Sequence, residues 1–353
     1  MNHPRDNESL NILRGCPGRV VTVQPDGLCF LGRRSTVFRS GDDGVTWTPV
    51  LTIPASPLRR AAGWSRLAAR LLRHEVRAFF PLSDGGFVAA TREGVFFSSR
   101  GERRMSPSRI DGEGLAVFPP MCLTIGPDDA VLWGEYWANR ERRAVRLFAS
   151  RDRGRTFQVI HTFPPGEIKH VHNLYFDPRR GHYWVLAGDH GTEPGIGRLS
   201  ADCRSFDWLV KGRQTFRAVC VFDLGDHLLY GTDSEKEPNA VIRIEKSSGR
   251  FERIQELDGS CIYACRFGGC YALSTSVEPS EVNRSNEAGL WISDDLHRWT
   301  RVYHARKDRW NATYFQFGSI VLPRGESDRE TLFFSGQALE GIDGQTLVAE
   351  IVA

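Results

Sequence analysis

The sequence predicts an all-β protein, a seven-bladed β-propeller in which small sheets surround a central channel. Three observations carry this prediction. A phrase of short strands and a Ser/Asp/Gly turn recurs every ~46 to 58 residues, the range of propeller arrays. Glycine is abundant at 35 of 353 residues, and aromatic residues make up 11% of the chain. Glycine is required in tight turns, and aromatic residues fill the contacts between sheets. A period of about 50 residues gives seven blades, and six is the alternative.

Two turns carry the repeat in full, beginning at Ser40 and at Ser150 and each reading S-x-D-x-G-x-T-[WF]. The aspartate is expected to accept backbone N–H groups across the turn, and the glycine to adopt a positive φ. The final aromatic residue is expected to fill the gap between neighbouring sheets. Shorter copies begin at Ser200 and Ser293, and weaker ones at Ser98 and Ser247.

These turns resemble the Asp-box (BNR) repeat of sialidase-like β-propellers. The resemblance implies that they are structural hairpins on the outer part of each blade, away from an active site. It covers the repeat and not the sialidase catalytic signature. That family has an early F/Y-R-I-P element, and the first predicted strand, Arg19–Val23, does not contain it. Sialidase activity is therefore not expected.

The chain is expected to form one domain over residues 1–353, closed by its two ends. The last phrase, 331–336 and 345–351, lacks its own turn and outer strand. N-terminal strands at 19–23 and 28–32 would complete a shared blade and remove the free sheet edges. Residues 56–75 interrupt the strand repeat, and their pattern predicts one short basic helix between the first two blades. Its apolar side would hold Trp64, Leu67, Leu71 and Leu72, and its solvated side Arg66, Arg70 and Arg73.

Composition narrows the function classes. The net charge of +3 gives no argument for nucleic acid, and no apolar run is long enough for a membrane span. The first fifteen residues lack the apolar segment of a secretion signal, so a cytoplasmic location is expected. The eight cysteines have no metal-finger spacing and are expected to be reduced thiols. The sequence contains neither a phosphate-binding P-loop nor a G-x-S-x-G nucleophile elbow.

The functional site is expected at one mouth of the channel. There the innermost strand of each blade begins and the second strand ends, so residues at these positions meet. They form a ring rich in His, Arg, Asp, Glu, Tyr and Gln. Candidate catalytic residues are His170, His172, Asp189, Arg217 and Tyr263, and candidate substrate-binding residues are Glu135, Tyr136, Trp137, His190, Gln214, Asp233 and Gln316.

This ring suits several chemistries. For β-elimination on a uronic acid, Arg217 or Gln316 would bind the carboxylate, while His170, His172 or Tyr263 would move the C5 proton. Hydrolysis needs two carboxylates, which Glu135, Asp189 and Asp233 offer. Tyr136 and Trp137 are expected to be exposed, where they could stack on a sugar. No cofactor is predicted; a divalent metal on His170, His172 and Asp189 is an alternative that no metal-specific spacing supports.

The sequence therefore predicts a carbohydrate-active protein that binds an acidic glycan at the channel mouth, either a polysaccharide lyase or a glycoside hydrolase. The alternative is a non-catalytic propeller for glycan binding or for protein interaction in polysaccharide assembly. Fold alone does not decide between them.

Overall fold

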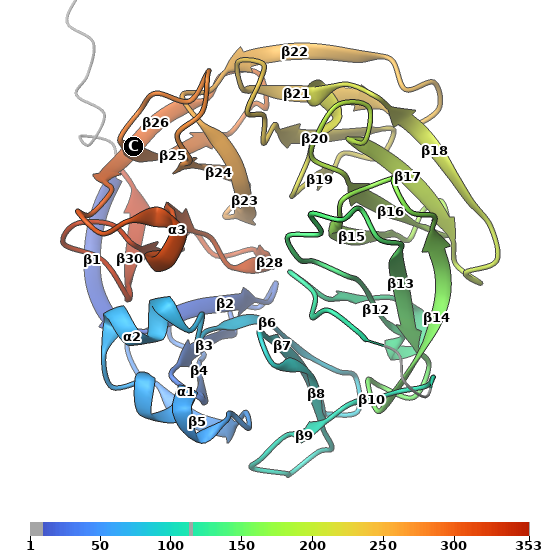
Figure 1. Ribbon diagram of the computed structural model, residues 1–353. Helices are drawn as coiled ribbons and strands as arrows, with labels where there is room; N and C mark the ends of the chain where they lie inside the picture. The colour runs from blue at the N-terminus through green and yellow to red at the C-terminus, as the bar shows by residue number, and fades with distance from the viewer. Residues whose placement is uncertain (1–9, 113–115, 353) are drawn as a thin grey trace, which may run out of the picture.

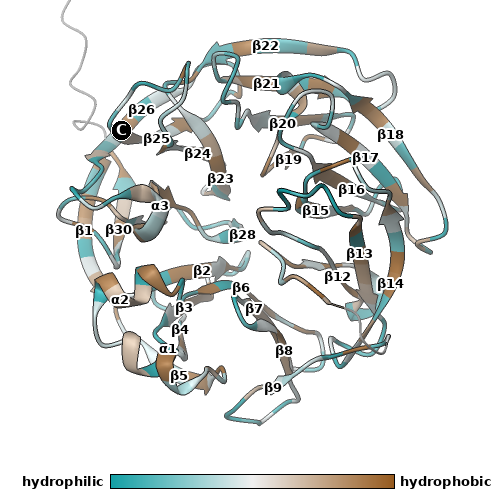
Figure 2. Ribbon diagram, in the orientation of Figure 1, coloured by the Kyte–Doolittle hydropathy of each residue, from teal (hydrophilic) through white to brown (hydrophobic). Residues whose placement is uncertain are grey.

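The computed structural model describes residues 10–112 and 116–352. Small antiparallel sheets are arranged around a central axis, so the protein is a β-propeller, as predicted (Figure 1). Hydrophobic residues follow the strands, and the connecting loops are largely hydrophilic (Figure 2). Residues 1–9 and 353, the limits of the predicted domain, lie outside the described residues.

The first half of the chain forms three successive groups of strands. The first group is β2 (Arg19–Val23), β3 (Cys29–Arg33), β4 (Thr36–Ser40) and β5 (Thr48–Thr52), followed by helices α1 (Pro57–Ala62) and α2 (Arg66–Leu71). The second is β6 (Val76–Pro81), β7 (Phe87–Thr91), β8 (Gly94–Ser98) and β9 (Ser106–Pro107). The third is β10 (Arg109–Ile110), β11 (Thr124–Ile125), β12 (Val131–Gly134), β13 (Val145–Ser150) and β14 (Thr156–Phe163), with a 3₁₀ turn at Pro127–Asp129.

The second half continues this pattern. Strands β15 (Val171–Asp177), β16 (His182–Ala187), β17 (Gly195–Ser200) and β18 (Phe206–Lys211) form one sheet. A 3₁₀ turn at Gln214–Phe216 leads to the sheet of β19 (Phe222–Asp223), β20 (His227–Gly231), β21 (Ala240–Glu245) and β22 (Phe251–Glu256). The remaining elements are β23 (Ser260–Phe267), β24 (Cys270–Val277), β25 (Glu287–Ser293), β26 (Thr300–Arg306), α3 (Ala312–Phe315), β27 (Gly318–Val321), β28 (Arg324–Ser327), β29 (Leu332–Gln337) and β30 (Gln345–Ile351), with β1 (Leu10–Pro17) paired to β30.

Near the axis, β28 pairs in parallel with β2 and with β23, which joins the first and last groups into one 13-stranded sheet. The ends of the chain close the ring elsewhere. Strand β1 runs antiparallel to β30 from Leu10 opposite Ile351 to Pro17 opposite Gln345. The closing strand is thus β1, whereas the expected closing segments 19–23 and 28–32 belong to the first group. The pairing satisfies the backbone groups that an open edge would expose.

The Ser/Asp/Gly turns have the expected local structure. In the first, Asp42 accepts the backbone N–H of Thr46 at 3.0 Å, and Gly44 has a φ of 76°. In the second, Asp152 accepts the N–H of Thr156 at 2.8 Å. Its closing aromatic residue, Phe157, is fully buried among strands of the preceding group. These turns therefore act as staples between neighbouring sheets.

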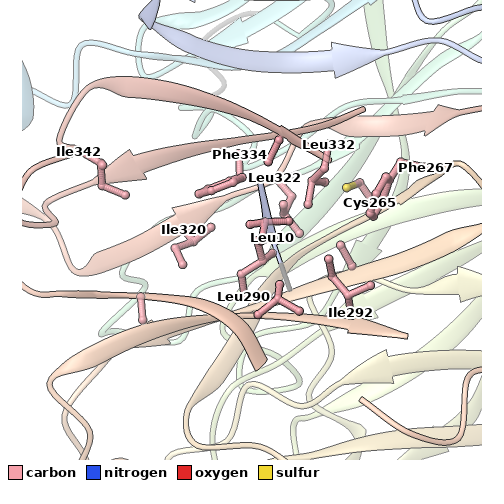
Figure 3. Close-up of a cluster of buried hydrophobic side chains, with 14 of the residues drawn as sticks. Leu10, Cys265, Phe267, Leu290, Ile292, Ile320, Leu322, Leu332, Phe334 and Ile342 are labelled. Carbon is pink, nitrogen blue, oxygen red and sulfur yellow. The ribbon is translucent and has the colours of Figure 1, made fainter. Parts of the chain in front are cut away.

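The core lies between successive sheets rather than in one central mass. Each buried apolar cluster joins one strand group to the next around the ring. In the cluster of Figure 3, Leu10 of β1 packs with Leu290 of β25 and with Leu332 and Phe334 of β29. The apolar contacts thereby support the same closure as the β1–β30 hydrogen bonds.

The prediction of one helix with solvated arginines over residues 56–75 was wrong. The segment forms two short helices, and Trp64 between them is 77% exposed. Arg70, expected in solvent, is only 2% exposed, because its guanidinium pairs with Asp308 and donates through Nε to the carbonyl of Phe315 at 2.7 Å. The charged side of α2 therefore anchors the segment 56–75 to the C-terminal part of the chain.

All eight cysteines are free. Of the three expected in the core, Cys261 and Cys265 are buried, whereas Cys270 is only half-buried. In the described part of the chain, no helix is long and apolar enough to cross a membrane.

A buried ion pair links two neighbouring strand groups. The Lys246 ammonium, which is fully buried, lies 2.6 Å from Asp177 and 2.6 Å from Asp223. Asp177 also accepts the indole N–H of Trp184 at 3.1 Å. The two carboxylates come from β15 and β19, so one cation holds two sheets together.

Replacing Lys246 with Met should lower the free energy of unfolding by about 3–5 kcal/mol, because Asp177 would keep a buried charge without its cation. Chemical denaturation measures this loss. The double variant Lys246→Met/Asp177→Asn should recover part of it, since no buried charge then remains uncompensated. The exposed Arg204→Met should change stability by less than about 0.5 kcal/mol. A loss below about 1 kcal/mol in Lys246→Met would contradict this account.

Candidate functional site

A cavity of about 440 Å³ lies where the innermost strands begin and the second strands end. It is walled by residues from the whole chain, from Arg19 in β2 to Gln337 at the end of β29. The structure brings nine of the twelve candidate residues to this wall: Tyr136, Trp137, His170, His172, Asp189, Arg217, Asp233, Tyr263 and Gln316.

Three candidates lie outside the residues that line the cavity. Glu135 is fully buried, and its carboxylate accepts the backbone N–H groups of Phe118 and Arg146 and pairs with the Arg146 guanidinium at 3.1 Å. His190 is exposed beyond Asp189. Gln214 is buried behind Asp189 and donates to its backbone carbonyl at 2.8 Å. Glu135 and Gln214 support the site, and neither can contact a ligand in the cavity from these positions.

His170, His172 and Asp189 form the tightest group in the wall. The Nε2 atoms of the two histidines are 3.1 Å apart. Asp189 Oδ1 lies 2.8 Å from His172 Nε2 and 3.2 Å from His170 Nε2. All three residues are at most 4% exposed. Burial lowers the pKa of His170. Burial acts to raise the pKa of Asp189, but the two histidines and Arg217 hold it well below its usual range.

Arg217 is already paired. Its guanidinium lies 3.1 Å from Asp233, 3.2 Å from Glu235 and 3.4 Å from Asp189. Burial opposes its charge, yet these carboxylates raise its pKa above the usual value. The expectation that Arg217 binds a substrate carboxylate does not fit this geometry, because three protein carboxylates already surround it. Gln316, the alternative, donates its amide to Glu75 at 2.9 Å and to Gln337 at 3.3 Å.

Two further carboxyl groups face the cavity with raised pKa values. Burial is the main cause for Asp233, and the Asp189 charge adds to it. Burial and the neighbouring Asp233 raise the pKa of Glu278 to about 8. Glu278 therefore keeps its proton at neutral pH and is a potential proton donor.

Arginines from the first two strand groups and from β28 form the opposite side of the cavity: Arg19, Arg73, Arg77, Arg92 and Arg324. Arg19 pairs with Glu75 at 3.7 Å and donates to the Tyr263 hydroxyl at 3.1 Å. The other four form no ion pair with any carboxylate of the described residues. Arg77 donates to the carbonyl of Pro120 and Arg324 to the hydroxyl of Tyr175. Their positive charge is thus available to an anionic ligand.

β-Bulges help to aim these side chains. The pairing of each of four inner strands shifts by one residue near its start, and the extra residues are Val21, Arg77, His172 and Ile262. An extra residue bends the strand locally and redirects its side chain. Arg77, His172 and Ile262 all line the cavity.

Tyr136 and Trp137 line the cavity but are half-buried, not exposed as expected. Trp137 stacks on Phe118 with ring centroids 4.3 Å apart, and Tyr136 lies 4.2 Å from the His170 ring. Burial raises the pKa of the Tyr136 hydroxyl above its usual value, so the group stays protonated. These contacts fix both rings within the wall.

The sequence-based assignment missed the arginine side of the cavity and Glu278. Applying the same strand-end rule to the first two groups would have found Arg19 and Arg77, which stand at the first and second positions of their strands. Glu278 follows the end of β24, so the strand-end rule already includes it, and only the choice of candidate site residues left it out. Arg92, directly after the end of β7, gives the same signal.

No protein-family model and no curated protein sequence matches this chain. Solved structures do, at low identity. The extracellular domain of a hybrid two-component system from B. thetaiotaomicron is 11% identical with a TM-score of 0.59, covering 98% of this chain and 43% of that one. The WD40 β-propeller domain of Doa1 is 10% identical, with a TM-score of 0.57 over 97% of this chain and 96% of that one. The GH74 xyloglucanase from Xanthomonas campestris is 14% identical, with a TM-score of 0.55 over 94% and 52%.

These similarities support the propeller fold alone. The chain spans 43% of the two-component protein's chain and 52% of the xyloglucanase chain, so it corresponds to one part of those larger chains.

The pKa of Glu278 gives a pH-dependent stability. Between about pH 5 and about pH 8 the folded protein retains a proton that the unfolded chain releases, so stability should fall as the pH rises, by up to about 1.4 kcal/mol per pH unit. Glu278→Gln cannot ionise, so the slope should flatten. Urea unfolding across this range measures both slopes. The exposed Glu281→Gln should keep the wild-type slope, and equal slopes in wild type and Glu278→Gln would refute the assignment.

Proposed function

We propose that this protein binds an acidic glycan in the cavity and cleaves it, with β-elimination at a uronic acid as the leading reaction. The observation that carries the proposal is the division of the cavity wall. Four arginines without carboxylate partners among the described residues face a side that holds histidines, a tyrosine and a protonated carboxyl group. A uronate carboxylate fits the first side, because guanidinium groups bind carboxylates through two parallel hydrogen bonds.

In this reaction the C5 proton of the uronate leaves to a base, a C4–C5 double bond forms, and the C4–O bond breaks as the leaving oxygen takes up a proton. Arginines stabilise the negative charge that develops on the carboxylate. Tyr263, held by the Arg19 hydrogen bond, acts as the base that takes up the C5 proton. Glu278 supplies the proton to the leaving oxygen. His170 and His172 assist the reaction indirectly, through the contacts that both make with Asp189.

Hydrolysis is the second candidate, and one observation favours it. Glu278 and Asp233 are neighbouring carboxyl groups of which at least Glu278 is protonated at neutral pH, as a glycosidase acid must be. A binding-only propeller would use the same arginines without proton transfer. The GH74 neighbour is named a xyloglucanase, which is compatible with a carbohydrate ligand but gives no substrate for this chain.

We also propose seven blades and membership of the Asp-box propellers. Seven apolar clusters, each between neighbouring strand groups, support the blade number. The hydrogen bonds of Asp42 and Asp152 support the repeat.

Binding tests the arginine side directly. Arg77→Ala should weaken the affinity for uronate oligosaccharides by about tenfold to a hundredfold, because a charge-assisted hydrogen bond is lost. Calorimetric titration measures the affinity, which should also fall with added salt. The matched control is Arg109→Ala, whose side chain is 79% exposed and outside the cavity wall. If wild type binds no acidic glycan, or if both variants bind alike, the proposal fails.

Cleavage is tested by incubation with uronate polysaccharides and ultraviolet detection of the unsaturated product. Tyr263→Phe should lower kcat about a hundredfold or more while the glycan Kd stays unchanged. The exposed Tyr314→Phe should remain active. New reducing ends without ultraviolet absorbance would show that the protein cleaves by hydrolysis and not by elimination. Binding without either product would leave a glycan-binding propeller.

A further inference from the structure

We infer that His170, His172 and Asp189 bind a divalent transition-metal ion at the edge of the cavity. The inference starts from the hydrogen bonds on the far side of each imidazole. His170 Nδ1 lies 2.8 Å from the carbonyl oxygen of Trp137, and His172 Nδ1 lies 2.9 Å from that of Ala218. A carbonyl oxygen only accepts, so both Nδ1 atoms must carry the proton.

This tautomer leaves both Nε2 atoms as lone pairs when the rings are neutral. The two lone pairs point at each other across 3.1 Å and at a carboxylate oxygen, which is itself an acceptor. Among the described residues, none donates a hydrogen bond to either Nε2 atom. Three acceptor atoms in a buried space repel one another unless a cation or an added proton lies between them.

The distances suit a metal ion. Metal–ligand bonds of about 2.1 Å at right angles place neighbouring ligand atoms about 3.0 Å apart. The three observed separations are 2.8, 3.1 and 3.2 Å. Tetrahedral angles would place them about 3.4 Å apart, so the geometry favours one face of a six-coordinate site. Two histidines and one carboxylate in this arrangement bind Fe²⁺ or Mn²⁺ and leave positions open for water or a ligand.

The surroundings are those of a metal site. Backbone carbonyls that accept from the distal imidazole nitrogens fix ring orientation in metal centres. Asp189 offers Oδ1 to the cluster, while its Oδ2 accepts from Lys169 and its backbone carbonyl from Gln214. Asp233 lines the same cavity, and its buried Oδ1 has no hydrogen-bond donor among the described residues. Lys169 and Arg217, two cations beside the cluster, are each already paired with a carboxylate.

The test uses the full-length protein, stripped with a chelator and then dialysed against Mn²⁺, Zn²⁺ or Mg²⁺. We expect one Mn²⁺ or Zn²⁺ per chain by elemental analysis, and little Mg²⁺, because imidazole ligands favour transition metals. His172→Ala and Asp189→Asn should each weaken the affinity at least about tenfold. His190→Ala, which removes an exposed neighbouring histidine, should bind like wild type.

A spectroscopic measurement on the unaltered protein covers the case in which the variants misfold. Co²⁺ bound at the site should give the weak visible bands of a six-coordinate ion and not the intense bands of a tetrahedral one. Retention of less than about a tenth of an ion per chain, or full binding in folded His172→Ala, would overturn the inference. Nitrogen NMR showing a protonated Nε2 on His172 with added metal would also overturn it and identify a proton-bridged ion pair. None of these outcomes requires glycan, so they are independent of the proposed function.

Discussion

The antiparallel pairing of β1 with β30 is the constraint on which the rest of the molecule depends. It joins the two ends of the described chain, and the apolar contacts of Leu10 with β25 and β29 reinforce it. A closed ring forces every innermost strand to begin at the same mouth. Side chains as distant in sequence as Arg19 and Gln337 then share one cavity. The site is therefore a product of topology, because no single segment contains it.

The cavity divides its charges according to chain order. Arginines come from the first two strand groups and from β28, whereas the histidines and most carboxylates come from the middle groups. Arg217 lies among those carboxylates and helps to keep Asp189 ionised, whereas burial and the neighbouring Asp233 keep Glu278 protonated. Separation of this kind allows one wall to hold an anion and the other to exchange protons or bind a cation.

Periodicity and local turn chemistry made the propeller and the strand-end positions predictable from the sequence. Tertiary pairing explains what was missed. Arg70 has the spacing of a solvated residue on α2, yet Asp308 and the Phe315 carbonyl, far along the chain, bury it. Glu135 stands at a strand end like Asp189, but its ion pair with Arg146 holds its carboxylate outside the cavity wall. The β-bulge at His172 could not be predicted, because the alternation of inward and outward residues along a strand does not reveal an extra residue.

Ring closure also determines when the site comes into being during synthesis on the ribosome. Strand β1 is made before the other described strands and has no partner until β30 has left the exit tunnel, so its edge stays unpaired while all the strands between them are made. The arginines of β2 and β6 are made long before Gln316 and β28, which complete their side of the cavity. A nascent chain thus carries both halves of the chemistry without bringing them together. The cavity can therefore assemble only after β30 has been made.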